Sequence, residues 1–157
     1  MTKEAFILKA EEMRLPLYRT ACAYLRQEAD RMDAVQEALL KAWKALPELR
    51  EERYFKTWLT RILIRECVNI QRHQRRVTPM EAVPEAGQED TGTNAALRDA
   101  ILALPEQQRI VIVLFYMEEY STDEIARALR LPKGTVCSRL KRARQTLKGF
   151  LEEEAEQ

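Results

Sequence analysis

The chain has 157 residues, enough for one ordinary domain or two small ones. Its 26 basic and 25 acidic side chains give a formal net charge of +1, so the overall charge indicates neither a nucleic-acid nor a membrane partner. The charge is nevertheless segregated. Residues 53–76 hold seven basic side chains and one acidic one, and residues 127–148 hold eight basic side chains and no acidic one. Such blocks indicate local electrostatic surfaces that cancel in the sum.

Three widely separated cysteines and a single histidine, His73, argue against a zinc site. We expect no metal, no cofactor, and three reduced thiols in a cytoplasmic protein. The first residues mix acidic with apolar side chains, unlike a signal peptide. The longest apolar run, 110–117, is too short to span a membrane, so we expect no direct membrane insertion.

Apolar residues recur at intervals of three and four, and no glycine precedes residue 87, which predicts an all-α chain. Helices are predicted at residues 4–27, 31–46, 54–75, 94–104, 106–117, 122–129 and 134–151. Residues 77–93 hold two prolines, two glycines, four acidic residues and no basic one, which is typical of a flexible linker. The prediction is therefore two small helical domains, 1–76 and 94–157, joined by a flexible acidic linker.

The helix predicted at 31–46, with Asp30 or a neighbour as its N-cap, has two contrasting faces. Its apolar stripe, expected in the core, consists of Val35, Ala38, Leu39, Ala42, Trp43 and Leu46. The opposite face carries Asp33, Gln36, Glu37, Leu40, Lys41 and Lys44. A single exposed leucine such as Leu40 is ordinary, but one surrounded by charge also suits a small protein-binding surface. The pattern alone leaves both interpretations open.

The helix predicted at 54–75 interleaves apolar and basic positions. Its expected core residues are Phe55, Trp58, Leu59, Ile62, Leu63 and Val68. Its basic residues are Lys56, Arg61, Arg65, Arg72, Arg75 and Arg76. Basic groups neutralise phosphates, and aromatic rings stack on unpaired bases at about 1–3 kcal/mol per base. This pattern favours a surface for single-stranded or melting DNA, although the aromatic rings also suit a core.

The last two helices have the order of a helix-turn-helix. Ser121 and Glu124 form a predicted capping box that starts a helix at Thr122, and Pro132 bars its continuation. That helix is expected to turn three residues inward, Ile125, Ala126 and Leu129. The next helix opens at Gly134 and has an apolar stripe of Val136, Leu140, Ala143 and Leu147.

The remaining positions of this last helix are polar and basic. Opposite the apolar stripe lie Ser138, Lys141, Arg142 and Gln145, with Arg139 and Arg144 on the flanks. A solvated surface helix gains stability by mixing charges, yet residues 128–148 contain no acidic side chain. The pattern therefore favours a recognition helix in the DNA major groove over a basic solvated face.

These segments resemble the extracytoplasmic-function (ECF) sigma factors of bacterial RNA polymerase. "LPEQQR", "STDEIA" and "GTVCSRLKRAR" are similar to the family's fourth conserved region, which reads the −35 promoter element. "DAVQEALLKAW" and "FKTWLTRI" are similar to its second region, which docks on the clamp of the largest polymerase subunit and captures the −10 element. The resemblance implies a non-enzymatic subunit that binds core RNA polymerase at the clamp and flap region. It also implies promoter-specific initiation through −35 recognition and −10 melting.

The resemblance and the helical patterns together assign roles to particular residues. The −35 base contacts are expected from Cys137, Ser138, Lys141 and Arg142, and contacts to DNA phosphates from Thr135, Arg139 and Arg144. The −10 contacts are expected from Lys56, Trp58, Arg61, Arg65, Arg72, Arg75 and Arg76. Core polymerase is expected to contact Asp33, Gln36, Glu37, Leu40, Lys41 and Lys44.

Three residues depart from the family pattern. Arg130 stands where a left-handed Gly or Asn is common, at a cost of about 1 kcal/mol. Cys137 offers no strong donor to a base. Arg65 stands where many relatives have Asn, and a guanidinium stacks or binds phosphate but does not reproduce an amide's paired donor and acceptor. We expect either an altered −10 preference or a phosphate contact at Arg65.

Two other classes of protein fit less well. A stand-alone helix-turn-helix regulator, the second interpretation, needs a sensor or dimer surface that the first domain does not suggest. An enzyme acting on nucleic acid needs a metal-ligand cluster, a phosphate loop or a nucleophile–base pair, and none of these patterns occurs. The resemblance also implies an anti-sigma factor as a partner, with sequestration at the inner face of the membrane where that factor is membrane-bound.

Overall fold

The computed structural model describes residues 1–77 and 95–155. Every regular element among these residues is helical, with no strand, which confirms the predicted all-α class. The chain divides into two compact units, Met1–Val83 and Pro84–Gln157, which are described separately below. The predicted linker, 77–93, lies outside the described residues except for Val77. No helix among the residues that the structure describes is long and apolar enough to cross a membrane.

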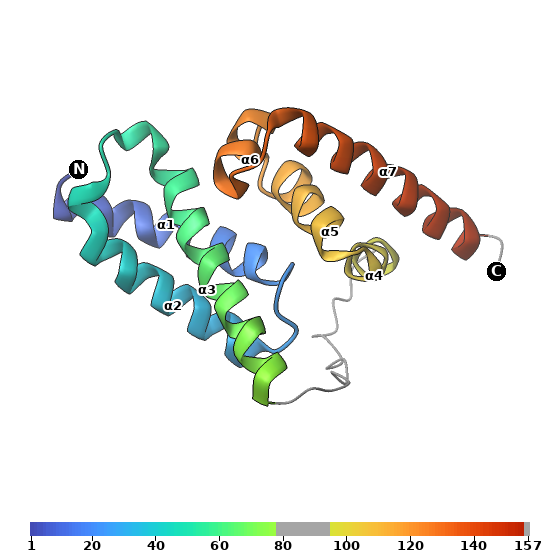
Figure 1. The fold of residues 1–157 in the computed structure, drawn as a ribbon, viewed down its shortest axis with the longest axis horizontal. Coiled ribbons are helices and arrows are strands. Elements are labelled where there is room, and N and C mark those ends of the chain that lie inside the picture. Colours follow the sequence, from blue (N-terminus) through green and yellow to red (C-terminus); the bar gives the residue numbers. More distant parts are fainter. Residues whose placement is uncertain (78–94, 156–157) are drawn as a thin grey trace. The chain divides into compact units, whose positions relative to one another are not determined.

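The first unit consists of three helices, of which α1 and α2 pack against each other and against α3 (Figure 1). They span Lys3–Ala21 (α1), Glu28–Ala45 (α2) and Phe55–Val77 (α3), with single 3-10 turns at Leu46–Glu48 and Glu52–Tyr54. α1 ends six residues before its predicted end. The backbone amides of Ala23, Tyr24 and Leu25 instead donate to carbonyls of Thr20 and Ala21, which closes a turn and buries Leu25.

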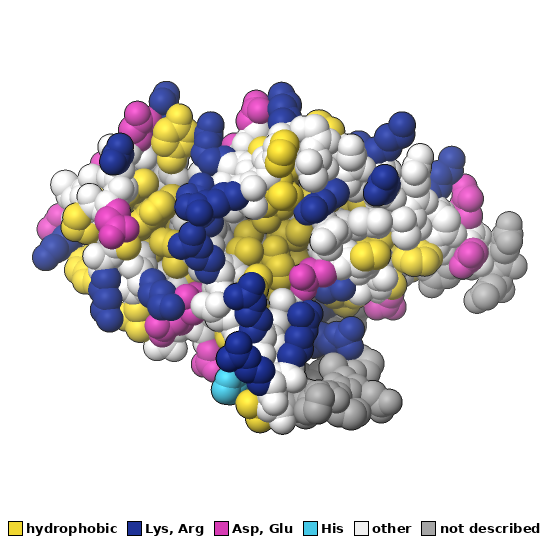
Figure 2. All heavy atoms as spheres, viewed as in Figure 1, with side chains coloured by type: hydrophobic (Ala, Val, Ile, Leu, Met, Phe, Trp, Pro, Cys, Tyr) yellow, Lys and Arg dark blue, Asp and Glu magenta, His cyan; other side chains and the backbone are white. Residues whose placement is uncertain are grey.

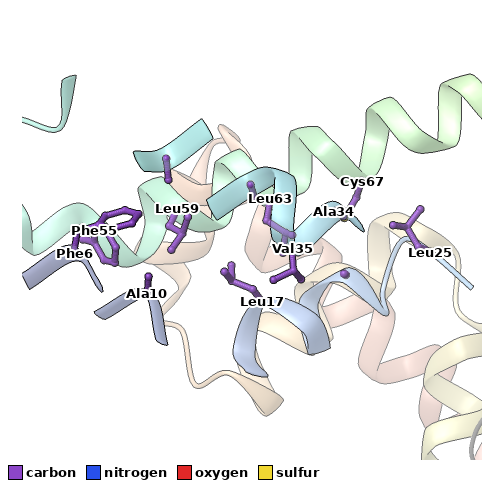
Figure 3. Close-up of a cluster of buried hydrophobic side chains, with 13 residues drawn as sticks. Phe6, Ala10, Leu17, Leu25, Ala34, Val35, Phe55, Leu59, Leu63 and Cys67 are labelled. Atoms are coloured by element: carbon purple, nitrogen blue, oxygen red, sulfur yellow. The ribbon is translucent and has the colours of Figure 1, made fainter. Parts of the chain in front are cut away.

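Side chains from all three helices form one apolar core (Figure 3). Leu17, Leu59 and Leu63 are fully buried at its centre, and Phe6 packs edge-on against Phe55 with ring centroids 5.8 Å apart. The apolar pattern predicted the α2 and α3 part of this core, namely Val35, Ala38, Ala42, Phe55, Leu59 and Leu63, and it named no core residue on α1. It missed Cys67, which is fully buried one position before the predicted Val68.

Two predictions for α2 were wrong. Trp43 was expected in the core but is 39% exposed, because only its edge packs on Phe6, at a centroid distance of 5.3 Å. Asp30 was expected to cap the helix, but α2 begins at Glu28 after Gln27, whose side chain makes no capping bond. Asp30 instead accepts a hydrogen bond of 2.6 Å from Nε2 of Gln74 on α3.

The second unit is built around a short central helix. Its elements are α4 (Ala95–Ala103), α5 (Glu106–Ile112), a π-helical turn (Val113–Met117), α6 (Thr122–Leu129) and α7 (Lys133–Ala155). The five consecutive residues 110–114 are all buried. A run of that length cannot share one face of a helix, so this segment is covered on more than one side. The sequence predicted a single helix over 106–117 and did not anticipate its π-helical end.

The helix-turn-helix forms as the sequence predicted. The amide of Glu124 donates to Oγ of Ser121 at 3.1 Å, and the amide of Ser121 donates to Oε1 of Glu124 at 3.0 Å, which confirms the capping box. Arg130 ends α6 in the left-handed conformation, with φ of 55° and ψ of 49°. α7 then starts after Pro132, whose carbonyl accepts from the amides of residues 135 and 136.

The inward faces of α6 and α7 are largely as expected. Val136, Leu140 and Ala143 are buried and Leu147 is half-buried, which confirms the stripe of α7. On α6 the buried residues are Ile125 and Ala128, whereas Ala126 and Leu129 are only half-buried. The inward position of Ile125 is therefore confirmed, Ala126 and Leu129 are turned inward only in part, and the buried Ala128 was not predicted.

Ser121→Ala removes the side-chain acceptor of the capping box and should destabilise the second unit by about 1 kcal/mol. Thermal unfolding followed by circular dichroism measures this loss. Ser138→Ala, on the exposed face of α7, is the matched control and should change stability little. Equal stability of both variants would contradict a structural role for the capping box.

Candidate nucleic-acid interface

The outer face of α7 carries the residues expected to read the −35 element. Cys137, Ser138, Lys141 and Arg142 are all exposed, and none lies in the apolar stripe that holds the helix on its unit. Thr135 and Arg139, expected at phosphates, are half-buried beside them. The structure thus brings the expected base readers together on one accessible surface, as a helix that enters the major groove requires.

Part of this surface is hollowed into an open pocket. Its lining comes from the start of α7, the preceding turn and the start of α5, namely Gln107, Gln108, Pro132, Gly134, Thr135, Ser138, Arg139 and Arg142. The stretch "LPEQQR" contributed to the sequence-based prediction only as a family pattern, and Gln107 and Gln108 were assigned no role. The spacing of residues along α7 could not predict that these glutamines lie beside it, because they belong to a different helix.

Arg144 is held by contacts within its own unit. Its Nε donates to the hydroxyl of Tyr116 at 2.5 Å, and its guanidinium lies 5.4 Å from the ring centroid of Phe115 and 5.5 Å from that of Tyr116. Both aromatic residues belong to the π-helical turn. A phosphate contact by Arg144 stays a prediction, and it would use the terminal nitrogens that this bond leaves unused.

The outer face of α2 is polar and exposed, as expected. Asp33, Gln36, Glu37, Lys41 and Lys44 are exposed, and Leu40 among them is 50% exposed. The face is therefore accessible to a partner, and its apolar centre is a single leucine.

Lys41 differs from its neighbours on α2 because it is paired with α3. Its Nζ lies 2.6 Å from Oε1 of Glu66, a residue only 7% exposed. The hydrogen bond to Glu66 raises the pKa of Lys41 above its ordinary value, and the nearby charges of Glu66 and Glu37 act in the same direction. Glu66 is the one acidic residue in the basic block of the sequence, and counting charges gave no sign that it is buried against α2.

α3 carries a basic outer surface toward its C-terminal end. Arg65, Arg72, Arg75 and Arg76 are exposed, and Figure 2 shows Lys and Arg side chains around the histidine near that end. Three other expected −10 residues, Lys56, Trp58 and Arg61, are half-buried.

Trp58 serves partly as a core residue. Its ring lies 6.0 Å from that of Phe55, and it packs against the main cluster. Only its exposed part is therefore accessible to an unpaired base.

Two glutamines fix the other side of α3. Nε2 of Gln71 donates to the carbonyl of Tyr24 at 2.8 Å, and Gln74 bonds Asp30 as described above. The first bond ties the turn between α1 and α2 to the helix that carries the basic surface, and the second ties the start of α2 to it. The sequence gave no signal for them, because the partners are more than 40 residues apart.

A helix-turn-helix whose outer helix carries no acidic residue up to residue 148, joined in one chain to an aromatic and basic helix, defines a DNA-binding transcription factor. The sigma-70 region 2 family matches residues 10–77, and the sigma-70, region 4 family matches residues 94–147. The chain is 34% identical over 139 residues to the ECF RNA polymerase sigma factor SigM of Mycobacterium tuberculosis, which covers 86% of this chain and 71% of SigM. It is 28% identical over 146 residues to the RNA polymerase sigma factor SigV of Bacillus subtilis, at 90% and 88% coverage.

A solved structure agrees with these matches. CnrH, in complex with the cytosolic domain of CnrY, superposes with a TM-score of 0.75 at 26% identity and covers 97% of this chain and 90% of CnrH. The chain belongs to the ECF sigma factors of the sigma-70 family.

Lys41→Met should destabilise the first unit by about 1–2 kcal/mol, because it leaves the nearly buried Glu66 carboxylate without its partner. Lys44→Met, three residues along the same exposed face, should stay within about 0.5 kcal/mol of the wild type. Urea unfolding at neutral pH measures both. Because the pKa of Lys41 is raised in the folded state, the stabilisation by this pair is fully present below the ordinary lysine pKa and is lost as the pH rises through the raised pKa. The difference in free energy of unfolding between the two variants should therefore shrink over that range. Equal stability of the two variants at neutral pH would show that the pair is not structural.

Proposed function

We propose that the chain binds core RNA polymerase and directs promoter-specific transcription initiation, with its two units sharing the recognition of the promoter. Residues 1–76 act as the region 2 domain, which binds polymerase and captures the −10 element. Residues 94–157 act as the region 4 domain, which reads the −35 element. The family matches to 10–77 and 94–147 support this division.

The observation that carries the proposal is the outer face of α7. Four polar or basic side chains stand exposed on one side of a helix whose other side is buried, and a capped helix-turn-helix presents it. In such a geometry the outward side chains reach base edges and the flanking cations reach phosphates. Arg142 suits a guanine, whose O6 and N7 accept a guanidinium in a bidentate contact.

The first unit supplies the two contacts that a stand-alone regulator does not need. The exposed face of α2, with Leu40 at its centre, is proposed as the polymerase-binding surface. The exposed arginines of α3 neutralise phosphates of the opened −10 strand. Arg65 lies among the exposed basic groups and is proposed as a phosphate contact in place of an amide that reads a base.

We also propose that the chain catalyses no reaction of its own. Sigma factors are non-enzymatic initiation factors, and the family match includes both units. Trapping a fluctuation that opens a base step needs no fuel, because stacking and phosphate contacts are comparable in free energy to the lost base stacking.

An inhibitory protein partner completes the proposal. CnrH, which resembles this chain over nearly its whole length, was solved with the cytosolic domain of another protein bound to it. We propose that an anti-sigma factor binds this chain in the cytoplasm and competes with polymerase for the exposed face of α2. Where that factor is anchored in the membrane, it holds the chain at the inner face.

The test of the function is reconstitution with purified core RNA polymerase. A promoter is first recovered from a random-sequence DNA library with the reconstituted holoenzyme, and run-off transcripts are then measured. Specific initiation is expected only when both the chain and core polymerase are present. Tight, specific duplex binding by the chain alone, without any effect on core polymerase, would support a stand-alone regulator instead.

Two variants separate the surfaces in this assay. Leu40→Ala combined with Glu37→Ala should weaken binding to core polymerase and leave the fold intact, because both side chains are exposed. Arg142→Ala should leave polymerase binding unchanged and weaken −35 recognition by about 1–3 kcal/mol if its contact is bidentate. Loss of polymerase binding in the Arg142 variant alone would contradict this division of roles.

A further inference from the structure

We propose that the pocket between α5 and the start of α7 seats one phosphate of the duplex DNA backbone and makes Gln107 and Gln108 part of the DNA-binding surface. This inference rests on the proposed function, in which the second unit binds the −35 element. It adds a second helix, α5, to a surface that the sequence places on α7 alone.

The chemistry of the lining suits an anion. Two guanidinium groups, two hydroxyl groups and two carboxamides surround the pocket, and no acidic side chain is among the described residues that line it. Arginine, serine, threonine and glutamine are all among the side chains that contact DNA phosphates. Arg139 provides the charge on the flank of α7, and Thr135 lies one turn before it.

Gly134 is a second, independent observation that favours a ligand in this pocket. A Cβ built on Gly134 meets no atom within 4 Å, and its φ is not positive, so neither crowding nor backbone conformation within the unit requires glycine. Glycine in a helix nevertheless costs roughly 0.5–1 kcal/mol relative to alanine. A close approach of a ligand is another common reason for glycine, and here the open space beside its Cα belongs to the pocket.

The two glutamines form the wall that faces α7 across the pocket. Gln107 is exposed, whereas Oε1 of Gln108 is buried with no hydrogen-bond partner among the described residues. No hydrogen bond of Oε1 therefore fixes the Gln108 carboxamide, and its Nε2 is a donor that a phosphate can use. A phosphate held by both helices fixes the depth and angle of α7 in the groove, since phosphate contacts position a reader on DNA.

Ethylation interference on the −35 duplex tests the proposal, because it shows for each DNA phosphate in turn whether its ethylation prevents binding. The probe is the promoter recovered with the wild-type holoenzyme, and the proteins are complete holoenzymes carrying Gln107→Ala or Arg139→Ala. Both variants should lose interference at the same single phosphate, with affinity lowered about tenfold. Arg139→Ala should also reduce the slope of log K against log salt by about one, whereas Gln107→Ala, which removes no charge, should leave the slope unchanged.

A pair of glycine variants supplies the matched control. Gly134→Ala should raise the thermal stability of the chain and yet weaken binding to the promoter several-fold, because its methyl group enters the space proposed for the phosphate. Gly149→Ala lies on the same helix with equally open space around it and outside the pocket lining. It should raise stability and leave promoter binding unchanged.

The possible failures are distinguishable. If the wild-type chain forms no active holoenzyme and recovers no promoter, the proposed function fails. If the holoenzyme is active but Gln107→Ala and Gly134→Ala retain the wild-type interference pattern and affinity, the pocket proposal is overturned. A changed base preference at one −35 position, with every phosphate interference retained, would make Gln107 a base reader and would also overturn it.

Discussion

The second unit depends on the packing of one apolar stripe against its central helix. Val136, Leu140 and Ala143 are buried on α7, and each valine or leucine buried in this way contributes about 1.5–3 kcal/mol. A rotation of α7 by one residue would replace two of these three side chains with arginine or lysine, so the packing fixes which side faces outward. The DNA-facing side of α7 is thus determined by the apolar side. Over residues 128–148 this side carries no acidic side chain, and the acidic residues of α7 follow only from Glu152 on.

The first unit differs from the second in that its basic helix, α3, contains one carboxylate. Glu66 is nearly buried on α3 and bonds Lys41 on α2, which joins the helix proposed to meet DNA to the helix proposed to meet polymerase. The basic surface of α3 therefore keeps its full positive charge toward solvent, because the single acid points inward. Lys41 therefore has a structural role that the sequence did not predict, and its contact with polymerase stays a prediction.

The sequence predicts much of this fold because periodicity and capping are local. The stripe of α7 and the capping box at Ser121 follow from residues within a few positions of each other, whereas the left-handed Arg130 was expected from the resemblance to the family. The exposed Trp43, the pairing of Asp30 with Gln74 and the burial of Glu66 depend on contacts between segments distant in the chain. The same holds for the pocket, whose lining joins Gln107 to residues about 30 positions away. A helical wheel shows which face is apolar but not what lies opposite it.

The outer face of α7 offers few side chains that discriminate between bases. The specificity of DNA binding therefore depends more on the accurate placement of α7 than on its number of hydrogen-bond donors. Cys137 is exposed among the expected readers, yet a thiol is a weak donor, and Ser138 bonds several bases with little discrimination. In the proposed function, discrimination falls mainly on Arg142, whose proposed bidentate contact tolerates little displacement. The capping box and the turn at Arg130 fix where α7 begins, and the phosphate proposed between α5 and α7 would act on the position of the same side chain. On this reasoning the specificity of the second unit lies as much in how α7 is held as in which residues it presents.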